Sequence, residues 1–364
     1  MTIEACDACL RRTALVAALG GAIDIQWRTR GATSAVLGLS DGALLDLAPG
    51  DRARRVHADF DAAAARERIA AARLGAACRH AAGYPDRLRE LPDPPAVLHV
   101  AGDPAALEDP DSVAIVGARK ASGYGLEVAR SLGRGLSVAG VTVVSGMALG
   151  VDSSAHTGAL EGAGATVAVL AGGADVPYPA SKRGLYARLV ERGCVVSELP
   201  PGFTAFRWCF PARNRVIAAL SRVTVVVEAA ERSGSLITVD FAAELGRPVG
   251  AVPGQVTSRL AAGTNGLLQQ GAALIRDARD VLDLVATDGG EVRGDGGEPL
   301  GTPLDPLDPT LQRLLDAVEQ SGGSLATLAA TPEEARAAIR GLTELELRGL
   351  VRREFGGRYV RCHR

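Results

Sequence analysis

The sequence contains very little lysine. Arginine supplies nearly all of its 40 basic residues, and the two exceptions are Lys120 and Lys182. A GC-rich genome that favours arginine codons explains this scarcity, but not the position of both lysines in glycine- or proline-flanked central segments. The formal net charge is −2, which argues against a histone-like protein coated in positive charge. A local basic patch remains compatible with nucleic-acid binding, because phosphates respond to local rather than net charge.

Aromatic residues and long apolar runs are also scarce. At 4% aromatic content, any stacking of bases on rings must rest on few side chains. No apolar run approaches the roughly 20 residues that a membrane helix needs, so we expect no membrane segment. The segment Met1–Arg12 lacks the apolar stretch of a secretory signal. Six cysteines in 364 residues do not make a disulfide scaffold, and we expect a reducing, cytoplasmic environment.

The residue pattern divides the chain into four segments. Residues 1–80 are rich in Ala, Leu and Arg with helical periodicity, which predicts a helical, SAM-like N-terminal domain. Residues 81–285 alternate strand and helix patterns and predict a Rossmann-like domain. Residues 286–309 are rich in Gly, Pro and Asp, which is typical of a flexible linker. Residues 310–364 predict a winged-helix domain.

The central segment predicts the fold class. Short apolar, β-branched runs, most of them followed within two residues by glycine, occur at 113–116, 141–144, 166–170, 194–196, 223–227 and 249–252. Such runs suit strands that are buried on both faces of a parallel sheet. Helical stretches separate them, so we expect a Rossmann-like, doubly wound and mostly parallel α/β sheet. Ligands of such sheets bind at the carboxyl ends of the strands.

The C-terminal segment carries the signals of a small winged helix. Residues 311–320 form an amphipathic pattern, and residues 324–330 predict a second short helix. Thr331 and Glu334 have the spacing of a capping box that opens a third helix. Residues 350–353 and 357–360 predict the hairpin of the wing. The third helix has mixed charge, so a protein contact and weak duplex binding are comparable hypotheses for it.

The tip of the first central strand has the features of an anion site. Gly117 allows the chain to turn, Arg119 and Lys120 supply two cations, and Ser122 begins a helix with free N–H groups. The run GARKASGYG matches neither the G-x-G-x-x-G motif nor a Walker loop. We therefore expect no NAD, no ATP and no other cofactor.

The tip of the second strand invites two interpretations. Ser145 and Gly146 again expose amides before a helix. Asp152 and His156 lie four residues apart beside serines, which suggests a hydrolase. We favour a local hydrogen-bonded or capping pair, because the chain has no G-x-S-x-G elbow.

Basic and aromatic residues follow the third strand. Lys182 and Arg183 begin a helix one turn before Tyr186. A cation and a ring together suit one nucleotide, with the phosphate on the charge and the base on the ring. The alternative is that Tyr186 belongs to the core, and the two hypotheses have equal weight.

A cluster of polar residues opens the next helix, namely Arg213, Asn214 and Arg215. Arginine at the positive end of a helix is unfavourable unless an anion compensates its charge. Glu198 and Glu228, both at strand ends, are candidate partners. We expect a phosphate to meet one arginine and a structural ion pair to hold the other.

Two further helix starts are polar and rich in glycine. They contain Ser233, Gly234 and Ser235, and then Thr264 and Asn265. Each signal is weak alone. Several such starts along one sheet edge form a long anion-binding rim, which suits a polymer better than one small ligand.

Taken together, these motifs resemble the DNA-processing protein A family (DprA, also called Smf). The resemblance covers roughly residues 84–285 and rests on VGARKASGYG, SGMALGVDSSAH, AGGADVPYP, FPARNRVIAALS, EAAERSGSLIT and PGQVTSRLAAGTN, in this order. It implies a protein that binds single-stranded DNA, forms a homodimer, protects incoming DNA in natural transformation and helps to load the RecA recombinase. It also implies a DNA pocket around Arg119, Lys182, Arg183 and Arg213, with Lys182 standing where the family commonly has Asn.

The main alternative is a nucleotide-processing enzyme of the lysine-decarboxylase-like group, which has a related Rossmann-like fold. That group carries a PGGxGTxxE motif. The corresponding run here, PGQVTSRLAAGTN, lacks the double glycine and the glutamate. We therefore expect a protein without catalytic residues.

Two cysteines near the start of the chain form an isolated C-x-x-C pair, Cys6 and Cys9. Cys78 and His80 have the residue types to complete a tetrahedral zinc site with them. A lone pair usually needs a second close pair, and the C-x-H spacing is tight. The sequence thus favours free thiols and no metal, with zinc as the less favoured hypothesis.

Overall fold

The computed structural model describes most of the chain. The described residues are 2–30, 34–47, 51–288, 308–321, 328, 331, 334, 337–338, 341–342, 345, 350–353 and 359–361. The chain divides into two compact units, Met1–Val292 and Arg293–Arg364. None of the described helices is both long and apolar enough to cross a bilayer.

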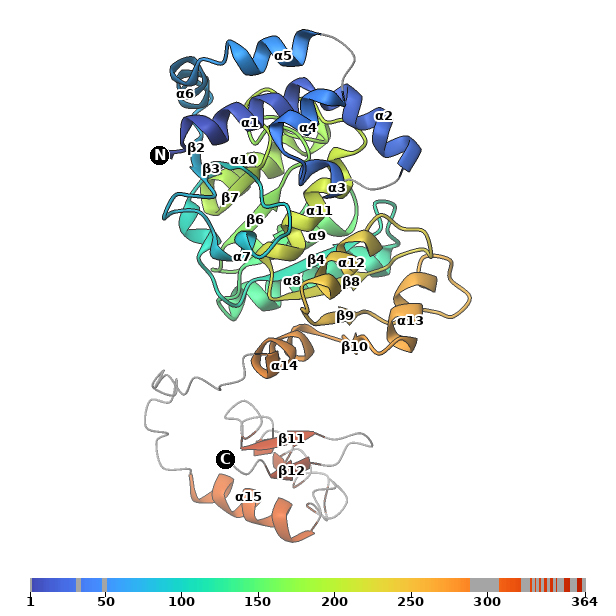
Figure 1. Ribbon diagram of the computed structural model, residues 1–364. Coiled ribbons are helices and arrows are strands. Elements are labelled where there is room, and N and C mark those ends of the chain that lie inside the picture. Colours follow the sequence, from blue (N-terminus) through green and yellow to red (C-terminus); the bar gives the residue numbers. More distant parts are fainter. Residues whose placement is uncertain are drawn as a thin grey trace. The chain divides into compact units, whose positions relative to one another are not determined.

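The first unit is built on a ten-stranded sheet (Figure 1). Its strands are β1 (Ile3–Glu4), β2 (Gly75–Cys78), β3 (Val97–Gly102), β4 (Val113–Gly117), β5 (Val143–Ser145), β6 (Thr166–Val169), β7 (Cys194–Ser197), β8 (Val223–Val227), β9 (Val249–Ala251) and β10 (Ala273–Leu274). The spatial order is β1-β2-β3-β7-β6-β5-β4-β8-β9-β10. Strands β4 to β10 run parallel, and β3 is antiparallel to both of its neighbours.

The predicted Rossmann-like, mostly parallel α/β sheet is therefore confirmed, and β4 shows why its strand runs are apolar without alternation. Ala114 and Val116 of β4 belong to one core cluster, and Val113 and Ile115 belong to another on the opposite face. All four side chains are at least 97% buried. Burial of a valine or isoleucine side chain contributes about 1.5–3 kcal/mol to folding, so both faces select apolar residues.

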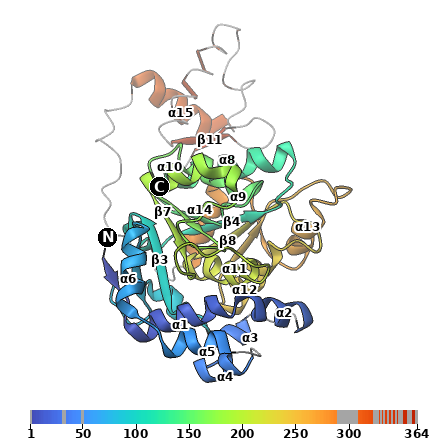
Figure 2. The same cartoon turned by 90° about the horizontal axis from the view of Figure 1, so that it is seen from above.

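Helices cover both faces of this sheet (Figure 2). They are α7 (Asp86–Arg89), α8 (Gly123–Val138), α9 (Val151–Ala159), α10 (Arg183–Arg192), α11 (Cys209–Leu220), α12 (Leu236–Glu244), α13 (Ala262–Gln269) and α14 (Ala278–Asp288), with short 3-10 helices η1 (Pro104–Leu107) and η2 (Ala180–Lys182). Helices α8, α9 and α14 share one core cluster, and α11 and α12 share the other. The parallel strands thus all present their carboxyl ends at one edge.

The N-terminal helices belong to the same compact unit. They are α1 (Asp7–Ala18), α2 (Gly20–Arg30), α3 (Ser34–Leu37), α4 (Asp41–Asp46), α5 (Asp51–Ala58) and α6 (Ala62–Ala71). Leu15 and Leu19 pack in one cluster with Trp208, and the Trp208 indole N–H donates to the Gly20 carbonyl at 2.9 Å. This contact anchors the chain where α11 begins. The division at residue 80 stays a prediction.

The second unit contains α15 (Pro309–Ser321) and the antiparallel strands β11 (Val351–Arg353) and β12 (Tyr359–Arg361). Thr331 and Glu334 form the expected capping box, each side chain accepting the other residue's backbone N–H at 3.3 and 3.1 Å. Most of the expected second and third helices, and residues 289–307 of the expected linker, lie outside the described residues. The winged-helix assignment stays a prediction.

Candidate nucleic-acid interface

A pocket of 340 Å³ lies at the carboxyl ends of β4, β5 and β8. This is the edge at which doubly wound sheets bind ligands. Eight residues expected from the sequence line it, namely Gly117, Arg119, Lys120, Arg213, Asn214, Ser233, Gly234 and Ser235. We call this the β4 pocket.

The loop after β4 brings two cations to the pocket. A Cβ atom at Gly117 would lie 1.9 Å from the Val227 carbonyl oxygen, so only glycine allows the two strand ends to approach. Arg119 and Lys120, which follow, are exposed. The Arg119 guanidinium lies over the Phe210 ring, 4.8 Å from its centroid. This stacking holds Arg119 at the mouth of the pocket.

Arg213 forms the basic wall of the pocket from inside. It is buried, and its Nη1 donates to the carbonyls of Gly146, at 2.7 Å, and of Val169. Among the described residues, Nη2 has no hydrogen-bond partner. Burial lowers the pKa of Arg213 to about 10, and the nearby Asp152 carboxylate opposes this shift. The guanidinium therefore remains charged at neutral pH.

The part of the lining next to Arg213 is polar. The Asn214 side-chain amide donates to the Gly234 carbonyl at 3.1 Å, and the hydroxyls of Ser233 and Ser235 are 2.8 Å apart. The Thr238 hydroxyl lines the same pocket, is buried, and has no hydrogen-bond partner among the described residues. The partly exposed hydroxyls of Ser233 and Ser235 are the groups on this polar wall that suit a ligand with oxygen atoms.

Two aromatic residues extend the site, and the sequence analysis did not identify them. Tyr178 is 49% exposed, and its ring lies 5.6 Å from that of Phe210, centroid to centroid. Phe210 in turn carries Arg119. In the sequence, Tyr178 and Phe210 each stand directly before a proline, in a segment that follows a strand. This pattern is the signal from which the two rings could have been predicted as part of the site. The pocket and the loop after β6 are thereby joined by a Tyr178–Phe210–Arg119 stack.

The expected anion position at the start of α8 is taken by a side chain of the protein. The Ser122 backbone N–H donates to Glu228 at 2.8 Å, and the Ser122 hydroxyl donates to the same carboxylate. A Cβ at Gly125 would lie 2.3 Å from a Glu228 oxygen, so glycine makes room for the carboxylate. Ser122 does not line the pocket. The Glu228 carboxylate accepts hydrogen bonds from Ser122 and, among the described residues, forms no ion pair with an arginine.

Arg215 is the arginine held by a structural ion pair. Its Nε lies 3.0 Å from Asp93, and both of its terminal nitrogens lie 2.8 Å from Glu198. The Arg215 side chain is 2% exposed. These carboxylates raise the pKa of Arg215 against the effect of burial. With every donor used internally, Arg215 is left out of the interface that we propose below.

The residues after β5 support the backbone. The Ser145 hydroxyl donates to the Ile115 carbonyl at 2.6 Å and is fully buried. Gly146 makes space for Arg213, because a Cβ there would lie 2.3 Å from its guanidinium. Burial raises the pKa of Asp152, which accepts from the Ala148 N–H at 3.3 Å.

His156 has no catalytic geometry. It is completely buried, and its Nδ1 lies 2.8 Å from the Thr166 hydroxyl. Burial lowers its pKa to about 3, so the imidazole is neutral at physiological pH. Among the described residues, no hydrogen bond joins the imidazole to the Asp152 carboxylate or to a serine hydroxyl. The hydrolase interpretation therefore receives no support from this pair.

The basic segment after β6 lies outside the pocket lining. Arg183 is exposed and Lys182 is half-buried. The Tyr186 hydroxyl donates to the Ala174 carbonyl at 2.8 Å, and its ring packs against a core cluster. Tyr178, four residues before Lys182, connects this segment to the β4 pocket through Phe210.

Thr264 and Asn265 are also separate from the pocket. The Thr264 hydroxyl donates to the Ala261 carbonyl at 3.1 Å, and the Asn265 amide exchanges hydrogen bonds with the backbone of Gly254 at 3.1 and 3.2 Å. Both side chains thus stabilise the local turn. Their role in ligand binding stays a prediction.

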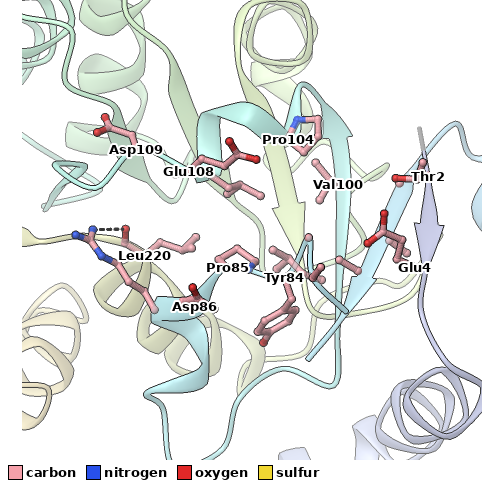
Figure 3. A pocket seen from close by; sticks show the side chains of 18 of the residues that line it. Thr2, Glu4, Tyr84, Pro85, Asp86, Val100, Pro104, Glu108, Asp109 and Leu220 are labelled. Carbon is pink, nitrogen blue, oxygen red and sulfur yellow. Dashed lines mark hydrogen bonds between the residues drawn. The ribbon is translucent and has the colours of Figure 1, made fainter. Parts of the chain in front are cut away.

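A larger cavity of 610 Å³ has the wrong charge for a phosphate (Figure 3). Its lining includes the carboxylates of Glu4, Asp86, Glu108 and Asp109. Arg87 supplies the cation in this lining and donates to backbone carbonyls of Pro110 and Leu220. Four carboxylates against one occupied guanidinium disfavour an anionic ligand there.

Comparison with known proteins identifies relatives. A family model described as DNA recombination-mediator protein A matches residues 76–286. The putative DNA processing protein DprA of Mycobacterium tuberculosis is 44% identical over 240 residues, which are 65% of this chain and 61% of that protein. DNA processing protein DprA of Bacillus subtilis is 39% identical over 200 residues, which are 55% and 67% of the two chains. The match thus spans less than two thirds of the mycobacterial protein.

Solved structures agree with this assignment. The X-ray structure of DprA from Streptococcus pneumoniae has a TM-score of 0.62 and 32% identity, covering 76% of this chain and 95% of that one. The structure of DprA from Helicobacter pylori, described for its single-stranded DNA binding mode, has a TM-score of 0.53 and 31% identity over 56% and 94% of the chains. The family model matches more than half of the sequence, and the chain therefore belongs to the DNA recombination-mediator protein A family.

Proposed function

We propose that this protein binds single-stranded DNA across the β4 pocket and the Tyr178–Phe210–Arg119 stack. The observation that carries the proposal is the position of Arg119 on the Phe210 ring, 4.8 Å from its centroid, at the mouth of a pocket with Arg213 in its wall. Cations beside exposed rings are the combination that binds a nucleotide chain, with phosphates on the cations and bases on the rings.

The residues divide the work by their chemistry. Arg119, Lys120 and Arg213 bind phosphate oxygens, because charged donors make the stronger hydrogen bonds to phosphate. The Ser233 and Ser235 hydroxyls complete the polar wall. A nucleobase of the strand stacks on Tyr178, the exposed ring of the stack. No base edge is read in this arrangement, so binding has little sequence preference.

A single strand fits this surface better than a duplex. Stacking on Tyr178 requires an open base face, and a duplex covers its base faces by pairing and stacking. Lys182 and Arg183, which follow Tyr178, extend the path along the sheet edge. The description of the Helicobacter pylori relative, 31% identical, as a single-stranded DNA binding protein supports the same choice.

The wider role follows from the family. We infer that the protein acts in DNA processing, protects incoming single strands in natural transformation and helps to load the RecA recombinase as a homodimer. Relatives named DNA processing protein DprA from Bacillus subtilis and Streptococcus pneumoniae support the processing role. The protein performs these tasks by binding, with no catalytic step.

An electrophoretic shift series tests the proposal. Labelled single-stranded and duplex oligonucleotides of equal length and mixed sequence are titrated with the full chain at several salt concentrations. We expect tighter binding to the single strand, similar affinity for unrelated sequences, and a slope of log K against log salt of about −0.7 per phosphate contact. Preference for the duplex, or turnover of nucleoside monophosphates in the same preparation, would overturn the proposal.

A further inference from the structure

Four sulfur and nitrogen ligand atoms meet at one point far from the β4 pocket. Cys6 precedes α1, Cys9 lies in its first turn, and Cys78 and His80 stand at the end of β2. Their ligand atoms all lie within 4.8 Å of one another. The two pairs of residues are about 70 positions apart in the chain, so the fold, rather than local sequence, assembles the cluster.

The distances fit a tetrahedral ion. The Sγ atoms of Cys6 and Cys9 lie 3.6 and 3.4 Å from the His80 Nδ1. In a tetrahedral zinc site with Zn–S of about 2.3 Å and Zn–N of about 2.0–2.1 Å, a sulfur and a nitrogen ligand are about 3.6 Å apart. The His80 Nδ1 therefore lies at about the distance from both sulfurs that separates two ligand atoms of one tetrahedral zinc ion.

A backbone N–H donor and a helix N-terminus both lie at the sulfur atoms of this cluster. The Cys6 backbone N–H donates to the Cys78 sulfur at 3.5 Å. Cys6 and Cys9 also stand at the positive end of α1, which stabilises negative charge. Cys9 and Cys78 are 2% exposed and belong to the core cluster that includes Ala5, Leu10 and Ala76. The apolar packing fixes both sulfurs while Cys6 and His80 close the cluster toward solvent.

We propose that Cys6, Cys9, Cys78 and His80 bind a structural Zn²⁺ ion. Soft thiolates and an imidazole select zinc over magnesium or calcium. All four tetrahedral positions are filled by side chains, so no position is left for a water or a substrate, which is the arrangement of a structural rather than a catalytic zinc site. The ion cross-links the start of α1 to the end of β2. The sequence alone favoured free thiols, and the geometry reverses this preference.

Metal analysis of the purified full chain tests the site directly. We expect about one zinc per chain after gel filtration in metal-free buffer, and a tetrahedral cobalt spectrum with sulfur-to-metal charge transfer after exchange with Co²⁺. Cys9→Ser and His80→Ala should each lose most of the bound metal. Cys194→Ala is the matched control, because Cys194 is equally buried but lies in β7, outside the cluster, and it should retain the zinc.

A stability readout on the wild-type chain does not depend on the folding of any variant. Metal binding that occurs only in the folded state adds to folding free energy, so a strong chelator should lower the Tm and added Zn²⁺ should restore it. Three thiols should react with a thiol reagent faster after chelation. Wild-type protein that takes up no zinc under reducing conditions would overturn the proposal.

Discussion

The Glu228 carboxylate caps helix α8 by accepting hydrogen bonds from the backbone N–H and the hydroxyl of Ser122. In many α/β proteins the corresponding helix start receives a ligand phosphate. Here a carboxylate from the neighbouring strand end occupies it. The cations available to a ligand are therefore Arg119, Lys120 and Arg213, beside this helix start rather than on it.

Replacement of Glu228 should reopen the helix start. In Glu228→Ala, the Ser122 backbone N–H and hydroxyl at the start of α8 lose their internal acceptor, and we expect phosphate or sulfate at millimolar concentration to raise the Tm more than in wild type. Loss of the cap itself should cost about 1–2 kcal/mol in the absence of the anion. Thermal unfolding with and without phosphate measures both effects. An identical response of variant and wild type would show that the start of α8 is no anion site even when vacant.

Arg119→Ala should weaken binding to every single-stranded sequence alike. Loss of one charge-assisted phosphate contact should reduce affinity about tenfold and make the salt slope shallower by about 0.7. Fluorescence anisotropy with two unrelated oligonucleotides gives both quantities. Arg130→Ala is the control, because Arg130 is an exposed arginine on α8 that pairs with Glu161. Equal affinities of the two variants would remove Arg119 from the interface.

Tyr178 should contribute through its ring rather than its hydroxyl. A base stacked on an aromatic side chain is worth about 1–3 kcal/mol, so Tyr178→Ala should lose between about fivefold and about 150-fold in affinity, whereas Tyr178→Phe should bind as wild type does. The salt slope should stay the same in both variants, because no phosphate contact is removed. If Tyr178→Phe lost as much affinity as Tyr178→Ala, a stacking role for the ring would be contradicted.

Arg215 should matter for stability and not for the DNA surface. Arg215→Met leaves the carboxylates of Asp93 and Glu198 buried without their cation, and breaking a buried pair in this way costs about 3–5 kcal/mol. The midpoint of urea unfolding measures the loss. Arg276→Ala, which removes a solvent-exposed pair with Asp280, should leave the midpoint close to that of wild type. A near-native midpoint for Arg215→Met would contradict the assignment.

Two buried histidines should make the fold sensitive to mild acid. Burial lowers the pKa of His99 to about 4 and that of His156 to about 3, from an ordinary value of 6.5. The unfolded chain takes up these protons first, so the stabilisation is complete above pH 6.5 and declines as the pH falls toward the folded values. Between pH 6.5 and 5 the free energy of unfolding should fall by up to about 1.4 kcal/mol per pH unit for each histidine.

Urea unfolding at pH 7, 6 and 5 measures this slope. In His156→Gln about half of the histidine contribution should disappear, since His99 remains. A free energy of unfolding that is constant from pH 7 to 5 in the wild-type chain would show that neither histidine is held neutral by the fold.

The sequence by itself determined the central sheet and the neighbourhood of the β4 pocket. Apolar runs such as 113–116 and 223–227 specify strands buried on both faces, and parallel strands necessarily place their carboxyl ends at one edge. Polar, glycine-rich segments that follow those strands, such as the one with Arg119 and the one with Ser233, therefore share that edge, and the strand order that sets β4 beside β8 brings these two together. Local pattern and topology were sufficient for this much.

Only the tertiary structure decided which partner each polar side chain takes. Arg213 and Arg215 look alike in sequence, yet Arg213 lines the β4 pocket and Arg215 binds Asp93, 122 residues away. Glu228 caps Ser122, and Cys6 and Cys9 meet Cys78 and His80. Charge and hydrogen-bonding energy depend on distances of a few ångströms between groups far apart in the chain. Residue type and spacing do not contain those distances, and the packing of the helices against the sheet sets them.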